Sequence, residues 1–427
     1  MTYGKYRVCV VGLGYVGLPL ALFAASRGHK VYGYDINQEH VAVLRSGNSP
    51  YKDEEIGRQV KKFHELITFT CLEEAIQKVD VVIVCVPTPV DNNCKPNLNP
   101  LISACQTIAR NTQEGQLVVI ESTVFPGTIE EIVWPIFEGT MKVGENFFLA
   151  HCPERIDPGN KVYTLPTLPR VLGGMTEKCA DKAYQFYTSL IDAPITRLSC
   201  IKAAETTKVV ENIFRDVNIA LVNELAKSFD VMGIDTVEVI KAASTKPFAF
   251  MPHYPGCGVG GHCIPVDPYY LIEKSREQGF NPRILALARD INEGMPHYTI
   301  QKMKDALGKA GIKLAEANVI LLGLSYKKDI DDVRESPALV LADLLTEEKI
   351  RFETYDPYVL HKSSVKDLDL ALLNKNCLII ATNHSVFDSI GAERLRRNGI
   401  KVVIDGRNCL DKDELVAKGI IYRGIGR

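Results

Sequence analysis

One glycine-rich segment near the N-terminus constrains the fold more than any other part of the chain. An apolar stretch typical of a strand, Arg7–Val11, runs directly into Gly12-Leu13-Gly14-Tyr15-Val16-Gly17, and a helical stretch follows. In this strand–turn–helix context the first glycine allows the tight turn, the second lets a pyrophosphate approach the backbone, and the third permits close helix–strand packing. The N-terminus of the helix offers N–H groups to the anion. The segment predicts a Rossmann-like dinucleotide-binding unit, the alternative being a βαβ unit whose glycine turn is only structural.

An acidic residue further along indicates which dinucleotide binds. A second strand, Lys30–Tyr34, ends at Asp35, 18 residues after Gly17. A carboxylate there accepts hydrogen bonds from the ribose hydroxyls and repels a 2′-phosphate. The sequence therefore favours NAD over NADP.

Polar loops follow the next two buried strands. The run 80–86 ends in Pro87-Thr88-Pro89, and Leu117–Ile120 ends in Glu121-Ser122-Thr123. In an open parallel sheet these ends face the cofactor, so we expect Pro87, Thr88 and Ser122 to contact it. The Thr123 hydroxyl could hold a ligand or water, or could cap the next helix.

An acid–base pair follows a later strand, 147–150. Pro153-Glu154-Arg155 lies at its end, where a carboxylate and a guanidinium can position a polar substrate or a water. A surface turn with a salt bridge is the alternative.

The middle of the chain is helical. Residues 199–232 contain neither proline nor glycine, and Lys208 and Asn212, four residues apart, share one face. Many apolar positions remain for packing, so this helix should join domains and pair with a second chain. A single lysine on such a helix is usually solvated, and a catalytic role for Lys208 is the rarer alternative. A second helix is expected over 284–309, bent or restarted at Pro296.

A glycine-rich loop follows the long helix and is the expected place of the chemistry. Gly256-Cys257-Gly258-Val259-Gly260-Gly261-His262-Cys263 lets the backbone approach a ligand, with Gly260 facing the substrate and Asp267 four residues after Cys263. A thiol in such a loop is placed like a nucleophile, although a buried, inert cysteine is the commoner case. Zinc ligation by His262 and Cys263 has little support, because no further Cys/His cluster completes a site, and we expect no metal.

The C-terminal third repeats the alternation of strands and helices. Strands over 318–322, 351–355, 377–381 and 401–405 predict a second doubly wound unit. Its first turn lacks the glycine motif and offers Tyr326 to stack on a base and Lys327 to bind phosphates. The alternative is a solvated run of charges.

Length and composition bound the remaining possibilities. A chain of 427 residues should form two or three domains, which we place at 1–198, 199–312 and 313–427. A net charge of −2 argues against nucleic acid or a membrane surface as partner, and no apolar run is long enough to span a bilayer. The N-terminus has no signal-peptide pattern, and the 12 cysteines form no CxxC pair, so we expect reduced thiols in the cytoplasm.

Taken together, these motifs resemble those of the UDP-glucose/GDP-mannose dehydrogenase family over nearly the whole chain. The stretches that carry the resemblance are Gly12 to Gly17, Glu121 to Thr123, Pro153 to Arg155, Glu205 to Glu224, Gly260 to Cys263 with Asp267, and Tyr326 to Ser336. The resemblance implies an NAD domain, a central helical domain that builds a homodimer, and a C-terminal UDP-sugar domain. It also implies oxidation of the C6 alcohol of a nucleotide sugar to a carboxylate with two NAD.

The resemblance also implies roles for individual residues. Cys263 would be the nucleophile that holds the intermediate aldehyde. Lys208 would stabilise developing oxyanions with Asn212 beside it, and Asp267 would support Lys208 and a water.

Further roles carry over to the loops. Thr123 and Glu154 would hold the catalytic water or assist proton transfer. Arg334 would reach the cofactor, and Tyr326 and Lys327 the nucleotide end of the substrate.

One departure points to a branch of the family. The UDP-glucose enzymes carry a second Glu four residues after the position of Glu154, and here that position is Pro158. The pattern is more similar to the branch acting on UDP-N-acetylhexosamines, with UDP-N-acetylglucosamine favoured over UDP-N-acetylmannosamine, as precursors of surface polysaccharide. The alternatives are a two-electron β-hydroxyacid dehydrogenase, which needs no cysteine, and a non-catalytic NAD-binding module.

Overall fold

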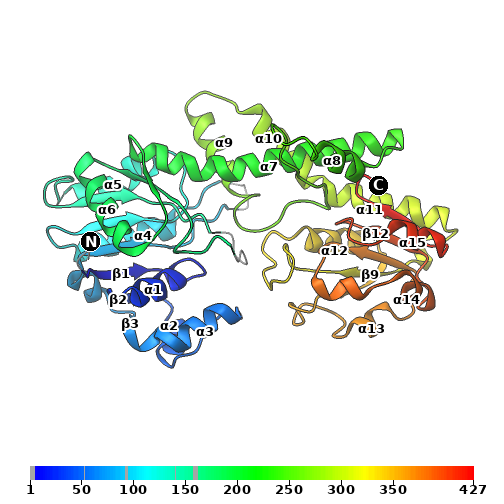
Figure 1. The fold of residues 1–427 in the computed structure, drawn as a ribbon, viewed down its shortest axis with the longest axis horizontal. Coiled ribbons are helices and arrows are strands. Elements are labelled where there is room, and N and C mark those ends of the chain that lie inside the picture. Colours follow the sequence, from blue (N-terminus) through cyan, green and yellow to red (C-terminus); the bar gives the residue numbers. More distant parts are fainter. Residues whose placement is uncertain (1–4, 52, 92–94, 140, 157–161) are drawn as a thin grey trace. The chain divides into compact units, whose positions relative to one another are not determined.

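The computed structural model describes residues 5–51, 53–91, 95–139, 141–156 and 162–427. These residues form two compact units: residues 1–211 with 269–280, and residues 212–268 with 281–427. Each unit contains a Rossmann-like sheet, and helices of the central region connect the two parts of the chain (Figure 1). The predicted α/β class, with two doubly wound domains and a long central helix, is confirmed.

The first unit is built on an eight-stranded sheet in the order β3-β2-β1-β4-β5-β6-β7-β8. Only the β6–β7 pair is antiparallel among the described strands. The strand bounds are β1 Arg7–Val11, β2 Lys30–Tyr34, β3 Ile67–Thr70, β4 Val81–Val84, β5 Leu117–Ile120, β6 Phe148–His151, β7 Arg170–Gly174 and β8 Ile195–Arg197. β3, β7 and β8, short strands at or near the edges of this sheet, were not predicted from the sequence.

Helices cover both faces of this sheet. Two apolar cores, one on each face, are formed by alternate residues of the strands, so that Val8 and Val10 join one core while Cys9 and Val11 join the other. The helices are α1 Gly17–Ser26, α2 Gln38–Arg45, α3 Glu54–Phe63, α4 Asn99–Asn111, α5 Trp134–Glu138 and α6 Glu177–Leu190.

The central region begins with the 32-residue helix α7, Ile201–Met232, which confirms the predicted long helix. The second predicted helix is two helices, α10 Arg283–Glu293 and α11 Met295–Lys309, separated at Gly294, with Pro296 in the first turn of α11. Proline is tolerated there because the first N–H groups of a helix have no intrahelical acceptor. The two remaining helices are α8 Thr236–Ala243 and α9 Asp267–Glu277. No helix among the described residues has the length and apolar character needed to cross a membrane.

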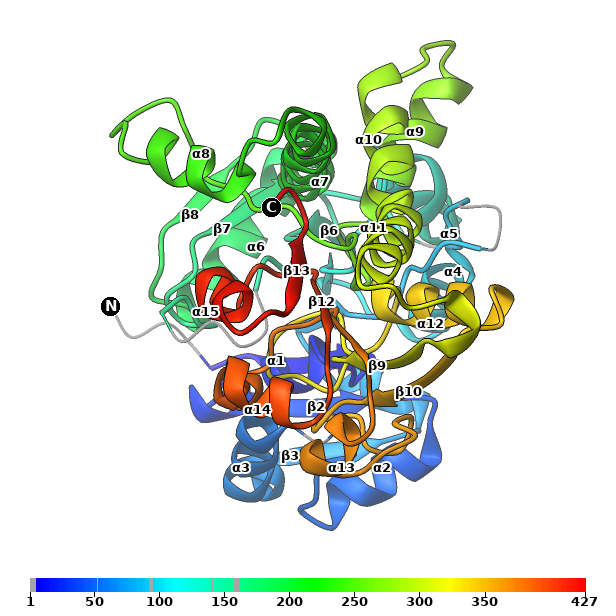
Figure 2. The ribbon, with the colours of Figure 1, turned by 90° about the vertical axis from the view of Figure 1, so that its right-hand side faces the viewer.

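The C-terminal sheet has five parallel strands in the order β10-β9-β11-β12-β13. Helices α11 and α12 pack on one face, and α13, α14 and α15 pack on the other (Figure 2). The bounds are β9 Asn318–Leu322, α12 Pro337–Glu347, β10 Arg351–Tyr355, α13 Leu368–Leu372, β11 Cys377–Ile380, α14 Ala392–Arg397, β12 Val402–Asp405, α15 Lys412–Ala417 and β13 Ile421–Gly424.

The two sheets use the same construction for the turn after their first strand. In the first, Gly12 has φ +89° and donates its N–H to the Tyr34 carbonyl at 2.9 Å, and the N–H of Leu13 donates to Asp35 at 2.8 Å. Only glycine adopts such a φ without strain.

In the second sheet, Gly323 has φ +84° and donates to the Tyr355 carbonyl at 2.9 Å, while the N–H of Leu324 donates to Asp356 at 2.6 Å. A carboxylate at the end of the neighbouring strand therefore anchors each turn.

Asp356 makes more contacts than its counterpart in the first sheet. Its Oδ2 also accepts from the N–H of Ser325 at 2.9 Å and contacts His384 Nε2 at 3.0 Å, and both side chains are fully buried. His384 in turn accepts the N–H of Asp329 at 2.9 Å. The sequence analysis did not predict His384 as part of this turn.

We expect Asp356→Asn to destabilise the second unit by about 1–3 kcal/mol at neutral pH, because one amide oxygen cannot replace the acceptors of a buried carboxylate. Burial acts to raise the pKa of Asp356, but hydrogen bonding and the charge of His384 hold it below its ordinary value. The ionised group therefore stabilises the fold above pH about 4, and that contribution is lost as the pH falls through the lowered pKa. Urea unfolding followed by circular dichroism measures the free energy of unfolding at pH 7 and pH 3. The difference in this free energy between the parent and the variant should be smaller at pH 3.

The control is Asp343→Asn, at an exposed position on α12. A difference between parent and Asp356→Asn that persists unchanged at pH 3 would contradict the assigned role.

Candidate active site

The loops at the carboxyl ends of β4 and β5 are tied to each other. The Thr88 hydroxyl donates to the Thr123 carbonyl at 2.6 Å, and the Ser122 hydroxyl donates to the Val86 carbonyl at 2.7 Å. Pro87 lies between these contacts. The structure thus brings together the residues predicted to face the cofactor at this edge of the sheet, while the Thr123 side chain itself stays partly exposed.

A buried network lies beneath this edge and was missed by the sequence analysis. Glu121 accepts a hydrogen bond of 2.5 Å from the Tyr187 hydroxyl and lies 3.4 Å from Arg170 Nη1. Burial raises the pKa of Glu121. The carbonyl of Glu121 accepts the N–H of Glu154 at 3.4 Å, so the network helps fix the neighbouring loop. Only the unusual position of Glu121, directly after a fully apolar strand, could have indicated it.

Glu154 and Arg155 do not pair with each other. Glu154 Oε1 accepts the N–H of Ile156 at 2.5 Å. Arg155 binds Glu211 of α7 at 2.5 Å and the Pro169 carbonyl at 2.9 Å. Arg155 is therefore held by an ion pair with Glu211, a residue distant from it in the sequence. Asp157 and Pro158, on which the choice of branch rests, lie outside the described residues.

The N-terminal half of α7 carries two buried charged side chains one turn apart. Glu205 accepts the N–H groups of Gly127 at 2.6 Å and of Ile129 at 2.8 Å. Burial raises the pKa of Glu205 to about 7, against the effect of these two hydrogen bonds. Lys208 is only 9% exposed, and no carboxylate among the described residues forms an ion pair with it. A buried ammonium is suited to binding an anion, because burial of an unpaired charge is otherwise costly.

Within the second unit, Asn212 and Asp267 are in contact. The Asn212 amide donates to Asp267 Oδ2 at 2.5 Å, and both residues are buried. The N–H of Asp267 donates to the Cys263 carbonyl at 2.8 Å, so a short turn places the partly exposed thiol next to the start of α9. The structure therefore joins three of the predicted catalytic residues.

The glycines of this loop make room for Tyr326. A Cβ at Gly260 would lie 2.6 Å from the Cβ of Tyr326, and one at Gly261 would lie 2.8 Å from its ring. The N–H of Gly261 also donates to the Arg334 carbonyl at 3.0 Å. The loop thus packs directly on the 326–337 segment, with Lys327 partly exposed at its beginning.

Arg334 is held close to this loop by a carboxylate. Its guanidinium binds Asp332 with distances of 2.6–3.1 Å, and this hydrogen bonding raises the pKa of Arg334. The charge of a Cys263 thiolate acts in the same direction, since the two groups are near enough to interact. His262 lies 4.0 Å from the same Asp332 carboxylate.

The first unit fits a dinucleotide. Helix α1 begins without a side-chain cap and without an acidic residue in its first turn. The space where a Cβ of Gly14 would project is open, with no atom within 4 Å. Free N–H groups at a helix N-terminus and an open backbone approach are what a pyrophosphate needs. Asp35 lies at the end of β2, its Oδ1 accepting the N–H of Asn37 at 2.9 Å.

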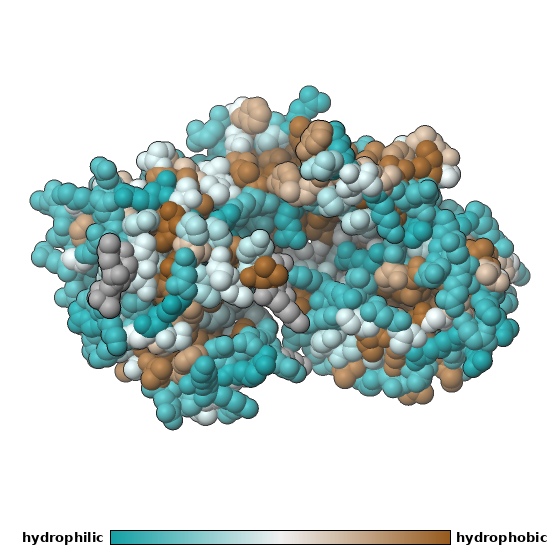
Figure 3. Space-filling view, viewed as in Figure 1, coloured by the Kyte–Doolittle hydropathy of each residue, from teal (hydrophilic) through white to brown (hydrophobic). Residues whose placement is uncertain are grey.

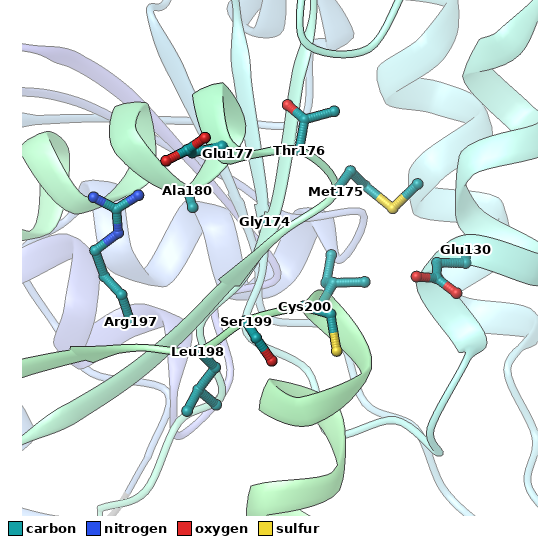
Figure 4. A pocket seen from close by; sticks show the side chains of 11 residues that line it. Glu130, Gly174, Met175, Thr176, Glu177, Ala180, Arg197, Leu198, Ser199 and Cys200 are labelled. Carbon is teal, nitrogen blue, oxygen red and sulfur yellow. The ribbon is translucent and has the colours of Figure 1, made fainter.

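A cavity of about 360 Å³ lies elsewhere in the first unit, at the beginnings of α6 and α7. Arg197 and Glu130 lie on opposite sides of it, with Cys200 between them (Figure 4). None of its lining residues is a predicted site residue. No group of three or more His, Cys, Asp and Glu residues suited to a metal ion occurs in the described part of the chain.

An open glycine turn in the first unit and a second Rossmann-like sheet in the other define a class of protein with two Rossmann-like domains, the first of which fits a dinucleotide. Three domains of one family match the chain in order: the NAD binding domain at residues 6–191, the central domain at 202–294 and the UDP binding domain at 320–412. The chain belongs to the UDP-glucose/GDP-mannose dehydrogenase family and is an NAD-dependent nucleotide-sugar dehydrogenase.

Full-length relatives agree with this assignment. A UDP-N-acetyl-D-glucosamine 6-dehydrogenase of Pseudomonas aeruginosa is 39% identical, over 96% of this chain and 98% of its own. A UDP-N-acetyl-D-mannosamine dehydrogenase of Pyrococcus horikoshii is also 39% identical, over 99% of both chains. The solved structure of the UDP-D-ManNAc dehydrogenase from P. horikoshii has a TM-score of 0.92 at 37% identity, over 99% of both chains.

We expect Glu205→Ala to destabilise the first unit by about 1–3 kcal/mol at pH 5, because it leaves two buried N–H groups without an acceptor. A carboxyl whose pKa is raised to about 7 by burial binds more protons in the folded than in the unfolded state. Its contribution is therefore complete in mild acid and falls as the pH rises through 7. Urea unfolding should show that Glu205→Ala lowers the free energy of unfolding more at pH 5 than at pH 8.

The matched control is Glu224→Ala, an exposed position on the same helix. A larger loss at pH 8 than at pH 5 would contradict this description of Glu205.

Proposed function

We propose that this enzyme oxidises the C6 alcohol of a UDP-N-acetylhexosamine to the uronate by a four-electron reaction through Cys263, with UDP-N-acetylglucosamine as the favoured substrate and surface polysaccharide as the destination. The observation that carries the proposal is the turn in which the carbonyl of Cys263 accepts the N–H of Asp267, which is itself bonded to Asn212. The relatives named for UDP-N-acetylhexosamines support the substrate class.

NAD supplies the hydride acceptor, one equivalent for each two-electron step. The first hydride leaves C6 and the hydroxyl proton is lost, giving an aldehyde. The Cys263 thiolate adds to that carbonyl carbon, forming a C–S bond and a thiohemiacetal. Loss of the second hydride and of the hydroxyl proton of the thiohemiacetal gives a thioester, and water then breaks the C–S bond, releasing the carboxylic acid and the thiol.

The chain's side chains support these steps. Lys208, as a buried cation, stabilises the alkoxide oxygens that form during addition and hydrolysis. Asn212 and Asp267 position the nucleophile's turn and a water. Thr123 and Glu154 hold the attacking water or accept its proton.

Other residues bind the two nucleotides. The Gly12–Gly17 turn, Asp35 and the loops at Pro87, Thr88 and Ser122 hold NAD, and Arg334 reaches it. Tyr326 and Lys327 bind the uridine diphosphate part of the substrate, and Gly260 and Arg155 contact its sugar.

The experiment is to incubate the enzyme with UDP-N-acetylglucosamine, UDP-N-acetylmannosamine and UDP-glucose and to count NADH formed per sugar consumed. We expect a ratio of about two for the true substrate, because the covalent intermediate retains the aldehyde. We expect Cys263→Ala to lower acid formation by about 10³-fold or more, since it removes the nucleophile. Cys200→Ala, which removes another exposed thiol, should leave the rate unchanged.

The alternatives give different results. A two-electron β-hydroxyacid dehydrogenase would give a ratio of one and would keep full turnover in Cys263→Ala. A non-catalytic module would bind NAD and form no NADH with any of the sugars. Greater turnover of UDP-N-acetylmannosamine would reverse the order of the two hexosamines without changing the mechanism.

We further propose that the protein is a cytoplasmic homodimer formed through the central helices. Phe214 and Leu221, seven residues apart on α7, are 47% and 53% exposed, and exposed apolar residues continue at Val231 and Met232. Figure 3 shows apolar surface along the region of α7 and α8. Apolar patches of this kind on a regular helix are typical of protein–protein interfaces.

We expect Leu221→Asp to convert the dimer to monomer or to raise its dissociation constant at least about tenfold, because a charge would be buried in the interface. Sedimentation velocity at several concentrations measures this. Val416→Asp, at an equally exposed apolar position on α15, should leave the dimer intact. A monomeric parent protein would reject the proposal.

A further inference from the structure

A pocket of about 330 Å³ lies in the second unit. Its lining residues come from the end of α7 and the turn after it, from α11, from α15, and from β13 and the end of the chain, and these elements can be followed in Figure 1. Its lining is dominated by charged side chains, and it contains no residue of the proposed active site. Five cationic side chains from distant parts of the sequence line it: Lys302, Lys309, Lys412, Arg423 and Arg427.

The carboxylates of the pocket already have partners. Asp230 binds Lys302 Nζ at 2.6 Å and the Tyr298 hydroxyl at 2.9 Å. Asp235 caps α8 by accepting two N–H groups, and it binds Arg427 Nε at 2.8 Å. These contacts fix Lys302, which is only 5% exposed, and Arg427 at the wall of the pocket.

Asp305 is the third carboxylate of the lining and accepts a hydrogen bond of 2.9 Å from the Gln301 amide. All three acids are thus engaged with donors of the protein.

Two of the cations are not neutralised. Arg423 donates one hydrogen bond, to the adjacent Tyr422 carbonyl at 2.9 Å, and its charge acts to lower the pKa of Lys302 after the larger effect of burial. Among the described residues, no carboxylate forms an ion pair with Arg423 or Lys309. Five cations and three acids give the lining a side-chain charge of +2. An α-carboxylate at Arg427 would remove one of these charges and still leave Lys309 and Arg423 unpaired.

We propose that this pocket binds a small polyanion of the phosphate class, with the size and charge of a diphosphate. A planar guanidinium and ammonium groups converging on a concave surface bind phosphate oxygens, and the buried Lys302 is already held in place. The lining offers Ile234 as its apolar side chain and no aromatic ring, so it is not built to hold a nucleotide base. The volume is at the small end of known ligand sites.

A bound anion would connect segments that the chain brings together only by folding. The cations come from α11, from the beginning of α15 and from the last residues of the chain, and Asp230 comes from α7. The ligand would therefore stabilise the second unit, by a free energy that grows with the logarithm of its concentration over its dissociation constant. The site is separate from the proposed reaction, and its occupation does not depend on the identity of the sugar.

The test is calorimetric titration with inorganic diphosphate at constant ionic strength. Excess NAD and UDP are present to fill the nucleotide sites, which could also bind diphosphate. We expect binding that becomes at least about tenfold weaker in Lys309→Gln/Arg423→Gln, because two charge-assisted contacts are lost. The matched control Lys313→Gln/Arg351→Gln removes the same charge from exposed positions outside the pocket and should bind like the parent.

Thermal unfolding of the three proteins gives an independent measurement. Diphosphate should raise the midpoint of the parent and of the control, and should raise that of Lys309→Gln/Arg423→Gln much less. Equal weakening in both double variants, which would indicate a general charge effect, overturns the proposal. The absence of binding to the parent does so as well.

Discussion

A carboxylate at the end of the neighbouring strand holds the first turn of each sheet, and much of the structure depends on this contact. Asp35 accepts the N–H of Leu13, and Asp356 accepts those of Leu324 and Ser325. The turn needs a glycine with positive φ at its start, and the N–H groups that follow cannot join a strand or a helix. An unpaired buried N–H costs free energy comparable to a lost hydrogen bond. The aspartate removes that cost and fixes the loop at the sheet edge where ligands bind.

The two sheets then diverge in what occupies the turn. In the first, glycines leave the beginning of α1 open, as a pyrophosphate requires. In the second, Ser325 stands where Gly14 stands in the first, and His384 fills the interior behind the turn. The loop that follows presents Tyr326 to the glycines before Cys263. One construction therefore supports two turns with different interiors, one left open and one filled by Ser325 and His384.

Helix α7 carries predicted site residues in both units. Its first turns carry Glu205 and Lys208, and Asn212 follows one turn later in contact with Asp267. Near its C-terminal end the same helix contributes Asp230 to the cationic pocket of the second unit.

The sequence by itself determined the fold class, the NAD-binding first domain with its glycine turn from Gly12 to Gly17, and the long helix. These follow from local patterns: glycine spacing, apolar runs and helical periodicity act between residues near in sequence. It did not predict β3, β7, β8 and β13, the buried Glu121–Arg170–Tyr187 network, the partner of Arg155, or His384 behind Asp356. Only the tertiary structure decided those, because a buried polar group selects its partner by three-dimensional proximity. Glu211 lies 56 positions from Arg155 in the sequence, and Tyr187 lies 66 positions from Glu121. Helical and strand periodicity relates only residues a few positions apart, so it cannot predict such pairs.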